Sequence, residues 1–139
     1  GPQAVADRGV DRFHVVKLLN ERLTKLLSSE AKAKQGRHWK VLKGLRWIVV
    51  KRRDQLRQET GEVDRLRQAL AVNKRLMIAY YLKEEFERFW QQKTKEKAAA
   101  FLDDWLRIAL DTSIGHLITF AESIGQYRQE LLNWYDKPI

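Results

Sequence analysis

The two prolines of this 139-residue chain, Pro2 and Pro138, stand at its ends, so no residue between them forces a helix to break. Apolar side chains recur at steps of three and four residues over most of the proline-free stretch, which is the spacing of one helix face. Hydrophobic residues make up 44% of the chain and charged residues 32%, a composition typical of a domain with a packed core. These features predict an all-α fold, a bundle of about five to six amphipathic helices.

Polar residues that can cap a helix stand just before several of the apolar stripes. Asp11, Asn73 and Thr94 each precede such a stripe, and their side-chain oxygens can accept a hydrogen bond from a backbone N–H of the first turn. Thr112 or Ser113 is the expected cap of the last helix. The apolar stripes predict helices over residues 13–34, 62–71, 74–92, 95–110 and 114–135.

One segment, residues 41–50, fits two structures. It can form a short helix or, from Leu45, a short buried strand, and we favour the helix because the surrounding segments are predicted to be helical. Trp47 precedes the apolar run Ile48-Val49-Val50, so we expect its side chain in the core. The aromatic residues of the later helices recur at helical spacing and are also expected in the core.

The whole net charge of +9 lies in one stretch of the chain. Residues 32–57 hold ten Lys and Arg residues against a single acidic residue, Asp54, whereas the rest of the chain holds seventeen basic and seventeen acidic residues. Clustered bases attract a polyanion and can contact its phosphates, and an interleaved Trp such as Trp39 can stack on bases. The open alternative is that these bases only solvate a helix face.

Several classes of function are excluded or find no support. The chain has no Cys, which excludes a disulfide framework, a thiolate nucleophile and a Cys-based zinc site. The GxxxxGK(S/T), GxGxxG and HExxH motifs are absent, and His14, His38 and His116 lack the spacing of metal ligands. We interpret the acidic residues at positions 84, 85 and 87 as a solvated helix face.

Nothing in the chain resembles a targeting or membrane segment. No run of residues approaches the roughly 18 apolar positions of a membrane span. The N-terminus reads Gly1-Pro2, with no methionine and no signal peptide. We therefore expect the chain to be a piece of a longer intracellular protein.

Five segments carry a resemblance to a known family. They are residues 11–20 (Asp-Arg-Phe-His-Val-Val-Lys-Leu-Leu-Asn), 43–51 (Lys-Gly-Leu-Arg-Trp-Ile-Val-Val-Lys), 54–56 (Asp-Gln-Leu), 81–86 (Tyr-Leu-Lys-Glu-Glu-Phe) and 131–139 (Leu-Leu-Asn-Trp-Tyr-Asp-Lys-Pro-Ile). In order and spacing they resemble segments of the bacterial DDE transposases of the ISL-three group of insertion sequences. The first segment resembles the surroundings of that family's second catalytic Asp.

The resemblance implies a place for this chain within a larger enzyme. In that family a helical insertion interrupts an RNase H-like core between the second catalytic Asp and the catalytic Glu. Residues 1–12 would then be the end of the core, and residues 13–139 the all-helical insertion domain. Asp11 would be a catalytic residue and one of three carboxylates that hold two divalent metal ions, Mg²⁺ or Mn²⁺. Because the other two carboxylates would lie outside the chain, we expect this fragment alone to be inactive and to hold no cofactor.

The resemblance also implies the partners. The parent would be a DDE transposase that cleaves and transfers DNA strands, a homo-oligomer of the bacterial cytoplasm associated with the nucleoid and not with a membrane. We expect the basic stretch 32–57 to contact transposon or target DNA, with Trp39 as a stacking partner, and the DNA-contacting bases to be Arg37, Lys40, Lys43, Lys51, Arg52 and Arg53.

Two alternatives remain open at this point. The chain can be a helical oligomerisation or scaffold module with no direct nucleic-acid role, or a free-standing helical regulator that binds DNA without cutting it. Salt distinguishes the first of these from the transposase hypothesis, because contact with DNA phosphates weakens steeply with ionic strength and an apolar interface does not.

Overall fold

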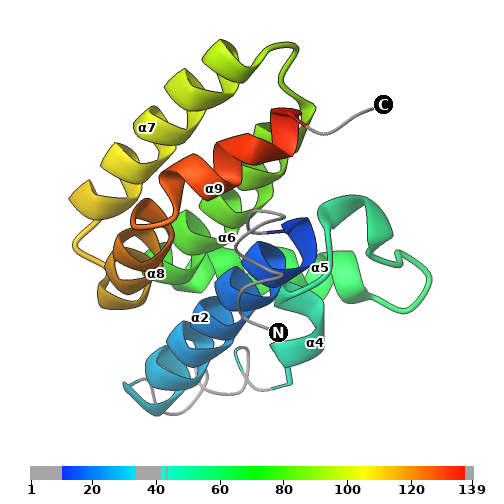
Figure 1. The fold of residues 1–139 in the computed structure, drawn as a ribbon. Coiled ribbons are helices and arrows are strands. Elements are labelled where there is room, and N and C mark those ends of the chain that lie inside the picture. The colour runs from blue at the N-terminus through cyan, green and yellow to red at the C-terminus, as the bar shows by residue number, and fades with distance from the viewer. Residues whose placement is uncertain (1–10, 34–41, 43, 137–139) are drawn as a thin grey trace. The chain divides into compact units, whose positions relative to one another are not determined.

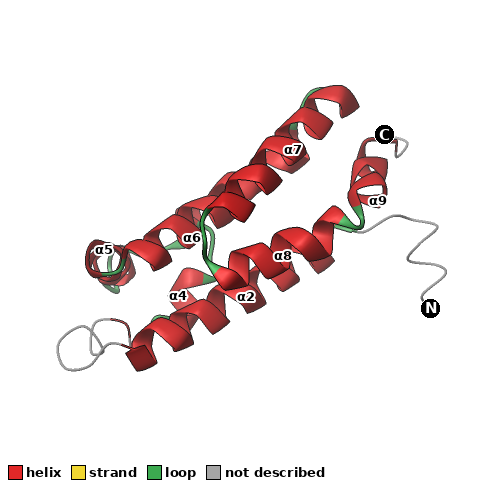
Figure 2. Cartoon of the chain, turned by 90° about the vertical axis from the view of Figure 1, so that its left-hand side faces the viewer, coloured by secondary structure: helices red, strands yellow, loops and turns green. Residues whose placement is uncertain are grey.

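The computed structural model describes residues 11–33, 42 and 44–136. Within these ranges every regular element is a helix and no strand occurs, as Figures 1 and 2 show, so the all-α prediction is confirmed. The α-helices of the described ranges are α2 (Arg12–Ala33), α4 (Arg46–Val49), α5 (Glu62–Val72), α6 (Lys74–Phe86), α7 (Lys95–Asp111), α8 (Gly115–Gly125) and α9 (Arg128–Leu132). Three 3₁₀ helices accompany them: η1 (Arg53–Gln55), η2 (Glu87–Gln91) and η3 (Asn133–Asp136).

Three of the predicted caps are present. The side-chain oxygens of Asp11, Asn73 and Thr94 each accept a hydrogen bond from the backbone N–H three residues further on, at 2.8, 2.9 and 3.1 Å. Such a bond satisfies one of the backbone donors that the first turn of a helix leaves without an intrahelical partner. These caps stand at the N-termini of α2, α6 and α7, and the helices α2, α5 and α7 begin and end within one residue of the predicted bounds.

The predicted single helix over residues 114–135 is wrong. α8 ends at Gly125, and Tyr127 adopts φ −107° and ψ 24° before α9 begins. Leu131 and Leu132 of α9 are both buried in the core. Neither Thr112 nor Ser113, the two predicted caps, is the N-cap of α8. The N-cap is Ile114, whose N–H donates to the Thr112 hydroxyl at 3.2 Å. In the same way, the predicted helix over residues 74–92 changes to the 3₁₀ helix η2 after Phe86.

The chain divides into two compact units, one of residues 20–84 and one of residues 1–19 with 85–139. In the first unit α4 packs against α5, and leucine and other aliphatic side chains form most of the core. Among the described residues of this unit, Tyr80 of α6 is the largest fully buried side chain. Asn73 is also buried there, and its amide donates to the Glu30 carboxylate at 3.0 Å.

The unit of residues 1–19 and 85–139 has an aromatic core. α7 packs against η2, α8 and α9 in this unit. The rings of Phe86, Trp105 and Phe120 meet edge to face, with centroids 4.9 to 6.0 Å apart, and all three side chains are buried. Such pairs stabilise a core beyond the area that they bury. The prediction that the aromatic stripes of the later helices form core is confirmed for these residues.

Trp47 is an exception, because its predicted place in the core is wrong. Its side chain is 68% exposed, and the Arg46 guanidinium lies over its ring at 5.0 Å. α4 is only one turn long, and the spacing of Leu45, Ile48 and Val49 places those three side chains on the buried face. Trp47 falls on the opposite face. The helix that we favoured for this part of residues 41–50 is present, in place of the strand.

Candidate nucleic-acid interface

Three of the predicted DNA-contacting residues form a continuous segment that joins α4 to η1. Lys51, Arg52 and Arg53, which we call the basic segment, follow Val50, the C-cap of α4, and Arg53 is the first residue of η1. Arg52 has an extended backbone, with φ −67° and ψ 149°. The other predicted contacts lie outside the described residues: Arg37, Trp39, Lys40 and Lys43.

Lys51 is engaged within the protein. Its Nζ lies 2.8 Å from Glu62 Oε2, and Glu62 Oε1 accepts the backbone N–H of Arg57 at 3.0 Å. The hydrogen bond from Lys51, together with that from Arg57, lowers the pKa of Glu62. Because Lys51 already has a carboxylate partner, it is a weaker candidate for phosphate contact than its position in the sequence indicates.

Arg52, Arg53 and Arg57 are more available. All three residues are exposed. The Nε atom of Arg52 lies 3.6 Å from Asp54 Oδ1, and both side chains are about half exposed or more, so solvent screens this pair strongly. A guanidinium group offers a planar fork of donors that suits phosphate oxygens. The region therefore presents three exposed guanidinium groups within six residues of chain.

Two residues of α6 hold the backbone of the basic segment, and sequence reasoning missed both. Lys83 is only 7% exposed, and its Nζ donates to the carbonyl oxygen of Lys51 at 2.6 Å. The neighbouring Glu84 accepts the backbone N–H of Arg53 through Oε1 at 2.6 Å. Their partners lie 31 and 32 residues away in sequence, so no local pattern marks them.

The interpretation of residues 84, 85 and 87 as a solvated face is therefore wrong for two of them. Besides Glu84, the carboxylate of Glu87 is engaged, because its Oε2 lies 2.5 Å from Nη2 of Arg12. Glu85 is exposed and pairs with Arg88, one turn along, at 2.7 Å. Glu87 lies in η2, beyond the end of α6, and helical periodicity over residues 74–92 does not predict that change.

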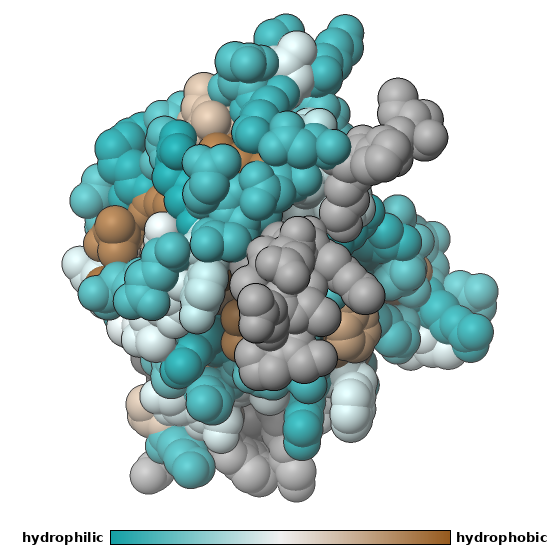
Figure 3. All heavy atoms as spheres, in the orientation of Figure 1, coloured by the Kyte–Doolittle hydropathy of each residue, from teal (hydrophilic) through white to brown (hydrophobic). Residues whose placement is uncertain are grey.

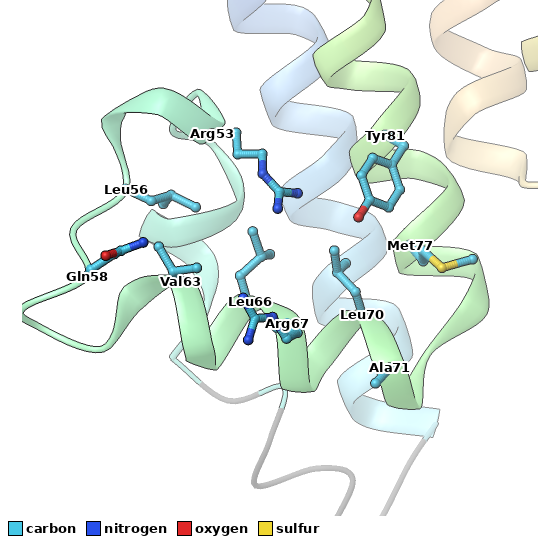
Figure 4. Close-up of a pocket in the computed structure, with 10 residues that line it drawn as sticks. All are labelled: Arg53, Leu56, Gln58, Val63, Leu66, Arg67, Leu70, Ala71, Met77 and Tyr81. Carbon is cyan, nitrogen blue, oxygen red and sulfur yellow. The ribbon is translucent and has the colours of Figure 1, made fainter.

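A pocket of about 510 Å³ lies beside the basic segment, within the unit of residues 20–84. Figure 4 shows Arg53 and Tyr81 extending toward its centre from opposite sides. Leu66 and Leu70 of α5 give it an apolar lining, and the other residues that line it are Leu56, Gln58, Val63, Arg67, Ala71 and Met77. A pocket that has both apolar walls and guanidinium groups suits a ligand group that is partly apolar and partly anionic.

Asp11 is predicted as a catalytic residue and not as a DNA contact. It caps α2 and is exposed, with its Oδ2 4.0 Å from Nδ1 of His14. Within the described ranges, no three carboxylate or imidazole side chains gather closely enough to hold a metal ion. Its assignment as a catalytic carboxylate stays a prediction.

The visible surface is polar in character. On the face seen in Figure 3, hydrophilic side chains predominate among the described residues, and hydrophobic ones appear in small separate groups. This face therefore offers charged and polar groups to a partner.

In the part of the chain that is described, the helices fall short of the length and apolar character that crossing a membrane requires.

Comparison with known proteins identifies relatives of the chain. The family model described as a transposase, of the DDE type and the ISL-three group, matches residues 2–139. The transposase for insertion sequence element IS1001 of Bordetella parapertussis is 31% identical over 126 residues, which are 88% of this chain and 30% of that transposase. The chain thus spans about a third of the length of this curated relative. No solved structure matches the chain. The chain belongs to the DDE transposase family of the ISL-three group of insertion sequences.

Proposed function

We propose that this chain is the helical insertion of a DNA transposase and that it contacts transposon or target DNA through the basic stretch 32–57. The observation that carries the proposal is the concentration of the entire net charge of +9 in that stretch of a transposase-family chain. Exposed Arg52, Arg53 and Arg57 support it, because they belong to the described part of the stretch. Contacts of this kind go to phosphates and position the DNA without reading its sequence.

Catalysis belongs to the whole enzyme in this proposal. Two divalent metal ions in such a site activate the attacking water or 3′-hydroxyl and stabilise the leaving oxygen. Asp11 fits the part of one ligand, because it is exposed and a carboxylate that accepts one hydrogen bond keeps lone pairs for a hard cation. We infer that the other two carboxylates come from the RNase H-like core outside this chain, and that residues 1–12 are the end of that core.

The test compares two triple variants that lose the same charge. Arg52, Arg53 and Arg57 are changed to Gln in one variant, and Arg88, Lys97 and Arg107, which are exposed and lie outside the basic stretch, are changed to Gln in the other. At one fixed low salt concentration, we expect the first variant to bind a generic duplex at least tenfold more weakly than the native chain, since about 1.4 kcal/mol or more is lost with the contacts. The second variant should lose little.

Two results contradict the proposal. Equal weakening by both variants means that only the total charge matters, and no particular surface contacts the DNA. Absence of binding by the native chain favours the oligomerisation or scaffold module, and sedimentation equilibrium of the same protein then tests that alternative by its oligomeric state.

A further inference from the structure

We propose that Lys83 and Glu84 are positioning residues that hold the basic segment in the conformation that contacts DNA. The inference rests on the proposed function, because it assigns a role within the same surface. It concerns two residues of α6 that contact the backbone of the segment and leave its arginine side chains exposed.

The two contacts bracket a single residue. Lys83 Nζ donates to the carbonyl oxygen of Lys51, and Glu84 Oε1 accepts the N–H of Arg53, both at 2.6 Å. Arg52 is the only residue between these two fixed backbone groups. Its backbone is extended and its side chain is 49% exposed. The geometry therefore fixes the chain on both sides of Arg52 and leaves the guanidinium outside.

The positioning pair is itself held in place. Lys83 Nζ lies 3.3 Å from Glu84 Oε2 and 4.6 Å from the centroid of the Tyr80 ring, which is fully buried. One carboxylate thus links the ammonium group to the N–H of Arg53. Charge-assisted hydrogen bonds of this kind are shorter and stronger than neutral ones, so they restrict the segment more than a solvated loop would be restricted.

The pair lies in segments that carry the family resemblance. Lys51 ends the segment 43–51, and Lys83 and Glu84 belong to the segment 81–86. The structure joins the two segments through the hydrogen bond from Lys83 Nζ to the carbonyl oxygen of Lys51. Arg53 also lines the pocket of Figure 4, so the same bonds fix one wall of that pocket.

Glu84 gives the inference a sharp test, because electrostatics and positioning predict opposite results. If Glu84 acts only through its negative charge, its removal strengthens DNA binding. If it positions Arg53, its truncation weakens binding although the net charge becomes more positive. Gln at the same position keeps an oxygen that can accept the Arg53 N–H and removes the charge.

The experiment measures duplex binding by Glu84→Ala, Glu84→Gln and Glu85→Ala in the 139-residue chain. We expect Glu84→Ala to bind roughly three- to tenfold more weakly than the native chain, the range that one lost hydrogen bond corresponds to. Glu84→Gln should bind at least as tightly as the native chain. Glu85→Ala removes the same charge one residue further along from an exposed side chain, and it should not weaken binding.

A second readout is independent of DNA. Amide hydrogen exchange at Arg53 should be faster in Glu84→Ala than in the native chain and should keep its protection in Glu84→Gln. If circular dichroism shows that Glu84→Ala does not fold, Lys83→Met replaces it. Its charge-matched control is Lys74→Met, because Lys74 is an exposed lysine of the same helix. Lys83→Met should then weaken binding more than Lys74→Met.

The outcomes separate the inference from the proposed function. Unchanged exchange at Arg53 in Glu84→Ala overturns the inference whatever the DNA results are. Tighter DNA binding by Glu84→Ala than by the native chain also overturns it, while the proposed function stands. Failure of the native chain to bind DNA defeats the proposed function, and the role in DNA contact falls with it even where the exchange data show that the segment is held.

Discussion

At the scale of the residue, Gly44 occupies a backbone position that requires glycine. It precedes α4 and adopts φ +81°, a conformation that L side chains rarely adopt. A Cβ built there would lie 2.9 Å from a guanidinium nitrogen of Arg65 on α5. Glycine therefore permits both the left-handed turn and the close approach of that side chain.

We expect Gly44→Ala to lower the free energy of unfolding by about 1–3 kcal/mol, because the backbone is strained and Arg65 must move. Urea unfolding followed by circular dichroism measures this. Gly61→Ala is a partial control, because its φ of +77° carries the backbone strain while nothing lies within 4 Å of its Cβ. Gly115→Ala, in a helix and with open space, should be neutral or stabilising. A Gly44→Ala protein as stable as the native chain contradicts this account.

At the scale of the element, the sequence predicts helices better than it predicts where they stop. The caps Asp11, Asn73 and Thr94 could be recognised because a cap acts within one turn of its own helix. The break between α8 and α9 could not, because the burial of Leu131 and Leu132 depends on packing against other elements. Short helices such as α4 depend on their neighbours in the same way, and this is why Trp47 was misplaced.

Ion pairs between elements could not be predicted from the local sequence either. Arg128, which begins α9, donates to both carboxylate oxygens of Asp103 on α7, at 2.8 and 2.9 Å. The hydrogen bonds from Arg128 lower the pKa of Asp103. A carboxylate whose pKa is lower in the folded state than in the unfolded state stabilises the fold above its unfolded pKa of about 3.9, and that contribution is lost as the pH falls through the folded pKa.

We therefore expect the urea midpoint to fall between pH 6 and pH 3, and part of this fall to come from Asp103. In Asp103→Asn the fall should be smaller, because the side chain no longer titrates. The matched control is Asp104→Asn. In the native chain the Asp104 carboxylate lies 3.5 Å from Arg107, one turn along the same helix, and its side chain is 72% exposed. An equal pH dependence in the native chain and in Asp103→Asn would contradict the assignment.

At the scale of the whole molecule, charge was the feature most visible in the sequence. The net charge of residues 32–57 is a sum over positions and needs no structure. Which bases are available does need one: Lys51 is paired with Glu62, eleven residues further along, whereas Arg52 and Arg53 are exposed. The residues that hold the basic segment were not predicted either, because Lys83 and Glu84 come to it from a different part of the chain.

The measurement that tests the central claim most directly is the salt dependence of duplex binding by the native chain and by the two triple Gln variants. Each phosphate contact contributes about 0.9 to the slope of log K against log salt concentration. The account predicts a steep slope for the native chain, a slope smaller by about 2–3 when Arg52, Arg53 and Arg57 are changed, and a native slope when Arg88, Lys97 and Arg107 are changed. The same slope in all three proteins, or no dependence on salt, would contradict the claim that the basic stretch is a DNA-contacting surface.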